Sequence, residues 1–207
     1  VLGYTPAWQA RDTVRYDVTA AVYDLDVARA LSQAAADMNR PASIHIKVDT
    51  GMARLGLLPG EVLAFVQQAL ALPGLRVEGI FTHFSVADSA DPEHVLHTEA
   101  QVAAFEAVLA ELDAAGIRLS VVHAANSAAT LSRPAAHFTM VRLGIALYGL
   151  APSVAVPLPA GFRPALRWKT QVAQVKVLPA GSPVSYGNTY RTCLLYTSPS
   201  PRDRTRS

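Results

Sequence analysis

Cysteine is almost absent from this chain of 207 residues, since Cys193 is the only one. We therefore do not expect a disulfide framework, a cysteine-based metal site or a thiolate nucleophile. No apolar run reaches the roughly 18 residues of a membrane-spanning helix, and no cationic and apolar signal-peptide pattern is evident. With 51% hydrophobic and 16% charged residues, the composition indicates a soluble globular protein with a sizeable core.

The last part of the chain, residues 193–207, differs from the rest. It has neither helical nor strand periodicity, and its sequence resembles a translated transposon-end adapter from a sequencing library. We expect a non-native tail here and exclude it from the fold. Without it, the 18 basic and 16 acidic residues fall to 15 of each. A net charge of zero gives no reason to expect binding to nucleic acid or membrane, and the composition is compatible with a cytoplasmic protein.

Strands and helices are predicted to alternate between about residues 16 and 149. The apolar strands are expected at residues 18–22, 44–48, 75–82, 121–122 and 140–147, and residues 1–3 could end another. Helical spacing of apolar residues separates them, with Asp24 and Pro92 typical of helix starts. Such alternation predicts a parallel sheet with right-handed crossovers, either a barrel or an open sheet.

The pattern changes after Gly149. Four prolines lie in a loop-like connection, and a β-like alternating stretch follows at residues 168–178. Residues 184–190 are expected to start another strand or loop. We interpret residues 151–192 as a linker and the beginning of a separate β-domain.

Polar groups follow or lie on each of the last four predicted strands. They are Arg54, then His83, then His123, Asn126 and Ser127, and finally Arg142, Gly144 and Ile145. Each has an ordinary structural explanation, such as a core histidine, a helix cap or a packing glycine. However, the carboxyl ends of parallel strands meet on one face, so their succession favours a site. Free backbone N–H groups at Gly144 and Ile145, with Ser127 at a helix start, would suit a phosphate.

Five motifs in this chain together resemble alanine racemase, in the family's order and across residues 1–192. They are Lys47-Val-Asp-Thr-Gly-Met-Ala-Arg-Leu-Gly56, Thr82-His-Phe84, His123-Ala-Ala-Asn-Ser-Ala-Ala129, Met140-Val-Arg-Leu-Gly-Ile-Ala-Leu-Tyr-Gly149 and Val184-Ser-Tyr-Gly-Asn-Thr-Tyr190. The resemblance implies a partial (β/α)8 TIM barrel, about strands 3–8, over residues 1–150. It also implies pyridoxal 5′-phosphate as cofactor, a C-terminal β-domain and a homodimer.

The resemblance assigns roles to catalytic and ring-binding residues. Tyr186 would be the base that removes the α-proton of L-alanine on the cofactor of the opposite subunit. Arg54 would hold the substrate carboxylate. Arg142 would donate to the pyridine nitrogen, with His83 and His123 supporting it. Because an arginine keeps its proton, that nitrogen would stay unprotonated and the ring would be a restrained electron sink.

The remaining assignments concern the phosphate and a modified lysine. Ser127, Gly144 and Ile145 would bind the phosphate, with Asn126 alongside. Lys47 matches a lysine that carries a carbamate in many members of the family and steadies the arginine corresponding to Arg54.

One expected residue is missing. Two-base racemisation needs a lysine that also holds the cofactor, and the family places it in a Lys-Ala-Asn-Ala-Tyr-Gly-like motif at the end of the first barrel strand. The chain contains only Lys47, Lys169 and Lys176, none in that context. We therefore expect a fragment that does not itself catalyse racemisation, from an enzyme that interconverts L-alanine and D-alanine for peptidoglycan.

Other functions remain open. A racemase for serine or for a broad range of amino acids would share this architecture. Decarboxylases of basic amino acids share the barrel but present a glutamate to the pyridine nitrogen, so Arg142 argues against them. A non-catalytic barrel that binds pyridoxal phosphate would lack the β-domain expected here. A β/α scaffold without a cofactor is disfavoured by the phosphate-type residues.

Overall fold

The computed structural model describes residues 1–193, which fall into two compact units. The first comprises residues 1–165, and the second begins at Leu166. The expected tail lies outside the described residues except for Cys193, so its origin stays a prediction. The predicted domain boundaries at residues 150 and 192 also stay predictions. None of the helices in the described range combines the length and the hydropathy needed to cross a membrane.

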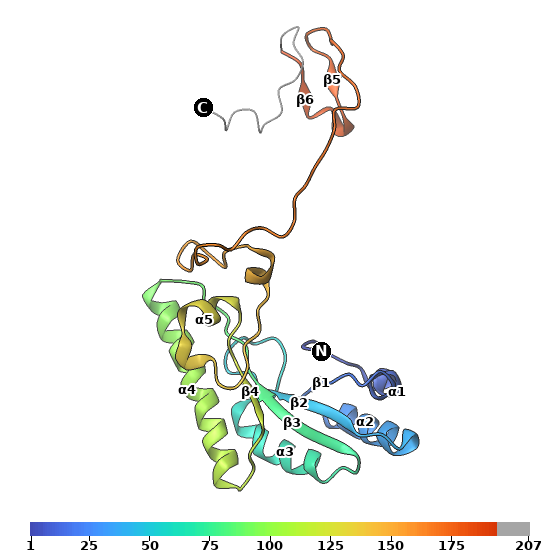
Figure 1. Cartoon of the computed structure of the whole chain (residues 1–207), viewed down its shortest axis with the longest axis vertical. Helices are drawn as coiled ribbons and strands as arrows, with labels where there is room; N and C mark the ends of the chain where they lie inside the picture. Colours follow the sequence, from blue (N-terminus) through green and yellow to red (C-terminus); the bar gives the residue numbers. More distant parts are fainter. Residues whose placement is uncertain (194–207) are drawn as a thin grey trace. The chain divides into compact units, whose positions relative to one another are not determined.

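The first unit is built on a four-stranded parallel sheet in the order β1-β2-β3-β4 (Figure 1). Its strands are β1 (Ala20–Val22), β2 (Ala42–Lys47), β3 (Leu75–Phe81) and β4 (Val121–His123). The helices of this unit are α1 (Ala10–Arg15), α2 (Leu25–Met38), α3 (Val62–Leu70), α4 (Pro92–Ala114) and α5 (Ser127–Ser132). The helices between successive strands confirm the β/α alternation. Val1 hydrogen-bonds to residues 19 and 21 beside β1, as the end of a further strand would.

Local sequence signals explain where the helices begin. The Asp24 carboxylate accepts the Asp26 N–H at 2.7 Å and caps α2. Asp91 caps α4 in the same way, and Pro92 occupies the first helical position, where no intrahelical donor is needed. These caps fix the points at which the chain leaves each strand end.

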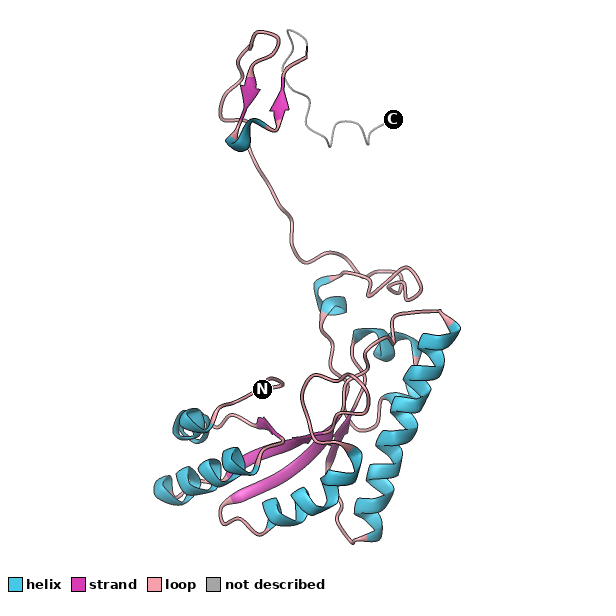
Figure 2. Cartoon of the chain, turned by 180° about the vertical axis from the view of Figure 1, so that it is seen from behind, coloured by secondary structure: helices cyan, strands magenta, loops and turns pink. Residues whose placement is uncertain are grey.

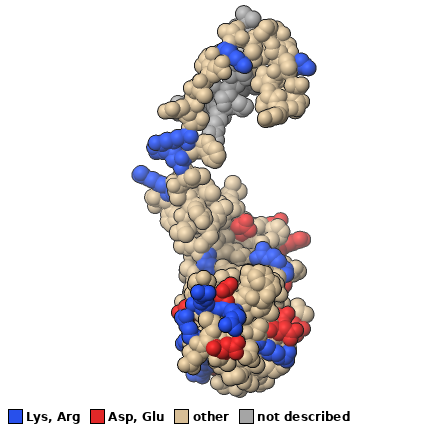
Figure 3. Space-filling view, turned by 90° about the vertical axis from the view of Figure 1, so that its right-hand side faces the viewer, with Lys and Arg blue, Asp and Glu red and all other residues tan. Residues whose placement is uncertain are grey.

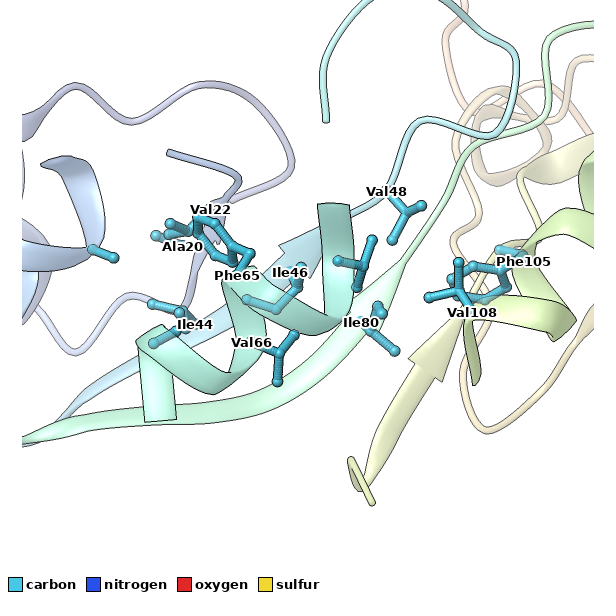
Figure 4. Close-up of a cluster of buried hydrophobic side chains, with 14 of the residues drawn as sticks. Ala20, Val22, Ile44, Ile46, Val48, Phe65, Val66, Ile80, Phe105 and Val108 are labelled. Carbon is cyan, nitrogen blue, oxygen red and sulfur yellow. The ribbon is translucent and has the colours of Figure 1, made fainter. Parts of the chain in front are cut away.

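The hydrophobic core lies between the sheet and the helices on one of its faces. Ile44, Ile46 and Val48 are fully buried, and Figure 4 shows them gathered with Val66 of α3 and Ile80 of β3. Because side chains alternate along a strand, the residues between these isoleucines lie on the opposite face. There β2 carries polar side chains rather than apolar ones, and this face leads to the site.

Two predicted strands are wrong. Over residues 140–147 only Met140 pairs with β4, as a single bridge to His123, and residues 145–148 form a 3-10 turn. The backbone N–H groups of Arg142 and Gly144 bond to Ala125 and to the Ser127 hydroxyl instead of to a strand. Residues 168–178 are irregular in the described structure, and their side chains are mostly exposed, so the alternating pattern meets no partner strand.

The second unit contains a small antiparallel hairpin, β5 (Pro183–Val184) with β6 (Tyr190–Arg191) (Figure 2). A 3-10 turn at Tyr186–Asn188 connects the two strands. In the first unit, basic and acidic side chains are intermixed on the face that Figure 3 shows. This surface has no large region of one sign, in agreement with the balanced composition.

Candidate functional site

Arg142 is the centre of a polar cluster at the carboxyl end of the sheet. Its Nη1 donates to His123 Nδ1 at 2.7 Å, and its Nη2 donates to the carbonyl oxygens of Thr82 and Ala124, each at 2.8 Å. Nη2 also lies 3.2 Å from His83 Nδ1. The remaining nitrogen of the Arg142 guanidinium, Nε, is buried and has no hydrogen-bond partner among the described residues. A buried N–H without an acceptor is costly, so Nε is the donor of this guanidinium that remains available to a ligand acceptor.

An aromatic ring supports the cluster. The Phe81 ring stacks on the His123 ring, with 4.6 Å between centroids and 4° between planes. The Arg142 guanidinium lies 5.3 Å and the Lys47 ammonium 5.0 Å from the Phe81 centroid, within the range of cation–π attraction. Phe81 therefore holds two cations and a histidine against one apolar surface.

The cluster is positively charged although its histidines are neutral at pH 7. Burial, reinforced by the charge of Arg142, lowers the pKa of His83 to about 4 and that of His123 to about 3. Burial lowers the pKa of Arg142 to about 10, so the guanidinium keeps its charge. Within the described residues, neither Arg142 nor Lys47 forms an ion pair with a carboxylate. The local electrostatics therefore favour an anionic ligand.

Lys47 is buried on β2 behind Arg142. Its Nζ donates to the Val48 carbonyl at 3.1 Å. Burial, together with repulsion from Arg142, lowers the pKa of the ammonium to about 8. More of this amine is thus uncharged near neutral pH than of an ordinary lysine, and the uncharged form is the nucleophile.

The loop after β2 is organised by a carboxylate that the sequence reasoning did not single out. Asp49 Oδ1 accepts the backbone N–H groups of Gly51, Met52 and Ala53, and Oδ2 accepts that of Arg54 at 3.0 Å. Burial raises the pKa of Asp49, but the four backbone bonds outweigh it and hold the pKa below its usual value. This arrangement fixes the backbone that carries Arg54.

The Arg54 side chain itself is exposed, in contrast to the buried Arg142. It lies near enough to Lys47 and His83 for its charge to lower the pKa of both. Arg54 is therefore at the rim of the cluster, where a charged group of a ligand is accessible to it.

A pocket of about 400 Å³ opens beside the cluster. The predicted residues that line it are His83, Asn126, Ser127, Arg142, Gly144 and Ile145. The Ser127 hydroxyl accepts the N–H groups of Gly144 at 2.8 Å and Ala146 at 3.3 Å. From the sequence we expected a free Gly144 N–H. That expectation is wrong, because this N–H donates to the Ser127 hydroxyl. Asn126 is the N-cap of α5, accepting the Ala129 N–H at 3.0 Å.

Gln101 connects two loops of the site, and no sequence signal pointed to it. This fully buried side chain on α4 donates from Nε2 to the His83 carbonyl at 3.1 Å and to Thr50 Oγ1 at 3.4 Å. Its Oε1 accepts the backbone N–H and the hydroxyl of Ser85. The loops after β2 and β3 are thereby tied to one helix.

Tyr186 belongs to the second unit, and its side chain is fully exposed. The first unit therefore brings together the predicted cofactor and carboxylate residues, whereas the predicted base is carried by the other unit. His45 was also missed. Its place two residues before Lys47 on β2, and hence on the same face, was the available signal.

The comparisons with known proteins agree with this geometry. Residues 1–152 match the family model described as alanine racemase, N-terminal domain. The chain belongs to the alanine racemase N-terminal domain family. Its relatives include the alanine racemase of Desulfovibrio desulfuricans, 45% identical over 93% of this chain and 51% of that protein. That of Desulfosudis oleivorans is 49% identical with the same coverage of both chains.

Solved structures of the family share the fold. Alanine racemase from Bacillus anthracis with bound L-Ala-P is 34% identical, with a TM-score of 0.83, and the match covers 94% of this chain and 50% of that one. The enzyme from Clostridium difficile 630 also has a TM-score of 0.83, at 33% identity, over 93% of this chain and 50% of its own. These neighbours confirm the α/β TIM-barrel fold class. The chain spans about half the length of the curated relatives it matches. Alanine racemases depend on pyridoxal 5′-phosphate.

Replacing Gln101 by methionine is expected to lower the free energy of unfolding by about 2–3 kcal/mol, because it leaves the buried polar groups of His83 and Ser85 without partners. Urea denaturation of the full chain measures this. Gln68→Met is the matched control, since Gln68 lies on the surface of α3 and bonds only within that helix. It should change the stability by less than about 0.5 kcal/mol. Equal effects of the two changes would contradict the role of Gln101 in this alanine racemase domain.

Acid should destabilise the domain well above the pH at which carboxylates titrate. The pKa values of His83 and His123 in the folded chain, about 4 and about 3, lie below the ordinary 6.5. Between these values and pH 6.5 the unfolded chain binds more protons than the folded chain. The contribution of the two neutral histidines to the free energy of unfolding is therefore fully present above pH 6.5 and decreases as the pH falls toward 4. Unfolding free energies measured at pH 7 and pH 5 check this, and equal values would contradict it.

Proposed function

We propose that the protein interconverts L-alanine and D-alanine with pyridoxal 5′-phosphate as its cofactor. The observation that carries the proposal is the buried Arg142 Nε–H, which has no partner among the described residues and belongs to a guanidinium that forms no ion pair with a carboxylate there. An unprotonated pyridine nitrogen is an acceptor that would satisfy it. The family match supports this choice of cofactor.

The residues present fit such a cofactor. Arg142 would donate from Nε to the ring nitrogen, while His123 and His83 hold the rest of its guanidinium. The Ser127 hydroxyl and the backbone N–H of Ile145 would bind the phosphate, the Gly144 N–H would join them once released from Ser127, and Asn126 fixes the start of α5 beside them. When bound, the cofactor supplies an electron sink for the charge that develops at the substrate α-carbon.

Arg54 would bind the carboxylate of the amino acid, since its exposed guanidinium stands at the rim and its backbone is fixed by Asp49. Lys47 would carry a carbamate. Its uncharged amine can attack carbon dioxide, forming an N–C bond and releasing a proton, and the lowered pKa of about 8 makes this feasible at neutral pH. The resulting negative charge would steady Arg54.

Tyr186 would remove the α-proton of L-alanine, acting in a homodimer on the site of the partner subunit. Its full exposure in the second unit is compatible with such a role. The second base must be a lysine, and none of the three lysines in residues 1–207 has the required motif. Activity is thus a property proposed for a protein with both bases, which would act in the cytoplasm and supply D-alanine for peptidoglycan.

A chimeric enzyme tests the proposal. Residues 1–192 would replace the matching half of the Desulfovibrio desulfuricans relative, which is 45% identical over this range. We expect the chimera to rescue a bacterial strain that requires D-alanine, and purified chimera to racemise L-alanine. Arg142→Leu in the same chimera should abolish rescue. A folded, cofactor-loaded chimera without racemase activity would overturn the proposal.

The alternative within the fold is a racemase with another substrate. A histidine racemase from Leuconostoc mesenteroides has a TM-score of 0.78 with this chain at 28% identity, so the fold alone does not select the substrate side chain. Assaying the chimera with L-alanine, L-serine and L-histidine distinguishes these candidates. We expect alanine to be preferred, in line with the higher identity to alanine racemases.

A further inference from the structure

A third member extends the polar cluster away from the pocket. His45 Nδ1 lies 2.9 Å from His123 Nε2, and His123 Nδ1 in turn accepts from Arg142 Nη1 at 2.7 Å. The three side chains come from β2, β4 and the segment after α5. They form one continuous row of hydrogen bonds, and His45 is the member farthest from the pocket, which it does not line.

The direction of every hydrogen bond in this row follows from Arg142. A guanidinium can only donate, so His123 Nδ1 must be without a proton. The single proton of the neutral His123 ring is then on Nε2, and it must be donated to His45. His45 Nδ1 therefore accepts, and the proton of the neutral His45 ring is on its own Nε2.

The surrounding residues make room for His45 in this position. Gly79 of β3 pairs with His45 across the sheet, and a Cβ at Gly79 would lie 2.9 Å from both Cδ2 and Nε2 of the imidazole. The absence of a side chain at Gly79 thus lets the His45 ring lie across β3. On the far side, the His123 ring is held by stacking on Phe81. Both rings are thus held by their neighbours in the positions that the hydrogen bond between them requires.

We propose that His45 is a positioning residue that, by accepting the His123 Nε2 proton, locks the His123 tautomer and with it the orientation of Arg142. Without His45, the Nε2–H of His123 loses its acceptor in the row, so only Arg142 still favours a bare Nδ1, and the opposite tautomer, which would direct an N–H at the guanidinium, becomes competitive. Arg142 would then lose one of the bonds that hold its Nε–H in place. The structural part of this inference is independent of function, whereas its consequence for cofactor binding rests on the proposed function.

Nuclear magnetic resonance of the full chain, labelled with ¹⁵N in its histidines, tests the row directly. A scalar coupling across the hydrogen bond is expected between a protonated His123 Nε2 and a bare His45 Nδ1. His45→Asn keeps an oxygen acceptor at the same distance along the side chain and should preserve the His123 tautomer. His45→Leu should shift His123 toward a mixture of tautomers. His137→Leu, which removes a histidine that bonds to the Thr130 carbonyl, is the matched control and should leave His123 unchanged. A proton on His45 Nδ1, or no coupling, would overturn the inference.

Cofactor affinity gives a second readout. Pyridoxal 5′-phosphate titrated into the chimeric enzyme should bind roughly 10-fold to 100-fold more weakly to the leucine variant, because the Arg142 hydrogen bond to His123 that orients its Nε–H is weakened. The asparagine variant should stay within about threefold of the parent. Equal affinity for the leucine variant and the parent would overturn the inference. A chimeric enzyme that binds no cofactor, although the full chain shows the coupling, would contradict the proposed function and leave the row of bonds established.

Discussion

Replacing Tyr186 by phenylalanine in the chimeric enzyme is expected to reduce alanine racemisation by roughly 10²–10⁴-fold, the usual contribution of a positioned general base. The same change should leave thermal unfolding unaltered, because the Tyr186 side chain is fully exposed and the phenyl ring keeps its shape. Exchange of the α-proton of L-alanine with deuterated solvent measures the chemical step. Differential scanning calorimetry measures the stability.

Tyr190→Phe is the matched control for this prediction. Tyr190 lies in the same hairpin, on β6, and also has an exposed hydroxyl-bearing ring. Its replacement should change proton exchange by less than about twofold. Undiminished exchange in the Tyr186 variant would remove Tyr186 from the mechanism, and a parallel loss in both variants would indicate damage to the hairpin.

Replacing Gly56 by alanine is expected to lower the free energy of unfolding by about 3 kcal/mol or more. Gly56 has φ +122°, where a side chain is strained, and a Cβ there would lie 2.8 Å from the Asp49 nitrogen and 3.0 Å from the Lys47 carbonyl oxygen. Backbone atoms cannot rotate away as a flexible side chain can. The loop that carries Arg54 must shift, so the variant chimera should also show a raised KM for alanine.

Gly60→Ala provides the comparison. A Cβ at Gly60 meets no atom within 4 Å, and its φ is not in the left-handed region, so alanine should be neutral or slightly stabilising. Urea denaturation of both variants of the full chain measures the difference. A Gly56 variant as stable as the Gly60 variant would show that the loop can rearrange at little cost.

The β/α alternation and the helix caps were predictable from the sequence because both depend on neighbours along the chain. Asp24 reaches an N–H two residues away, and apolar periodicity records which face of a helix is covered. The strand predicted at residues 140–147 failed for the opposite reason. Its N–H groups bond to Ala125 and Ser127, distant partners that local pattern does not encode.

The sequence also predicted only part of the candidate site. His83 and His123 stand out because they follow predicted strands and Arg142 because it lies on one, and the structure brings the three together. Gln101 lies in the middle of a long helix and resembles any polar helical residue, yet it is fully buried and ties two loops of the site together. Its role depends on long-range packing. Inspecting the residues that follow predicted strands therefore does not identify residues that support the site loops from a neighbouring helix.

The division of the chain into two units separates two kinds of evolutionary change. The cationic cluster and its pocket are contained in residues 1–165, whereas Tyr186 is carried by the unit that begins at Leu166. On the proposed assignment, substitutions that tune ligand retention and substitutions that tune proton chemistry fall in different parts of the gene. Recombination at the connection between the units would then exchange the proposed base while keeping the cationic cluster and its pocket intact.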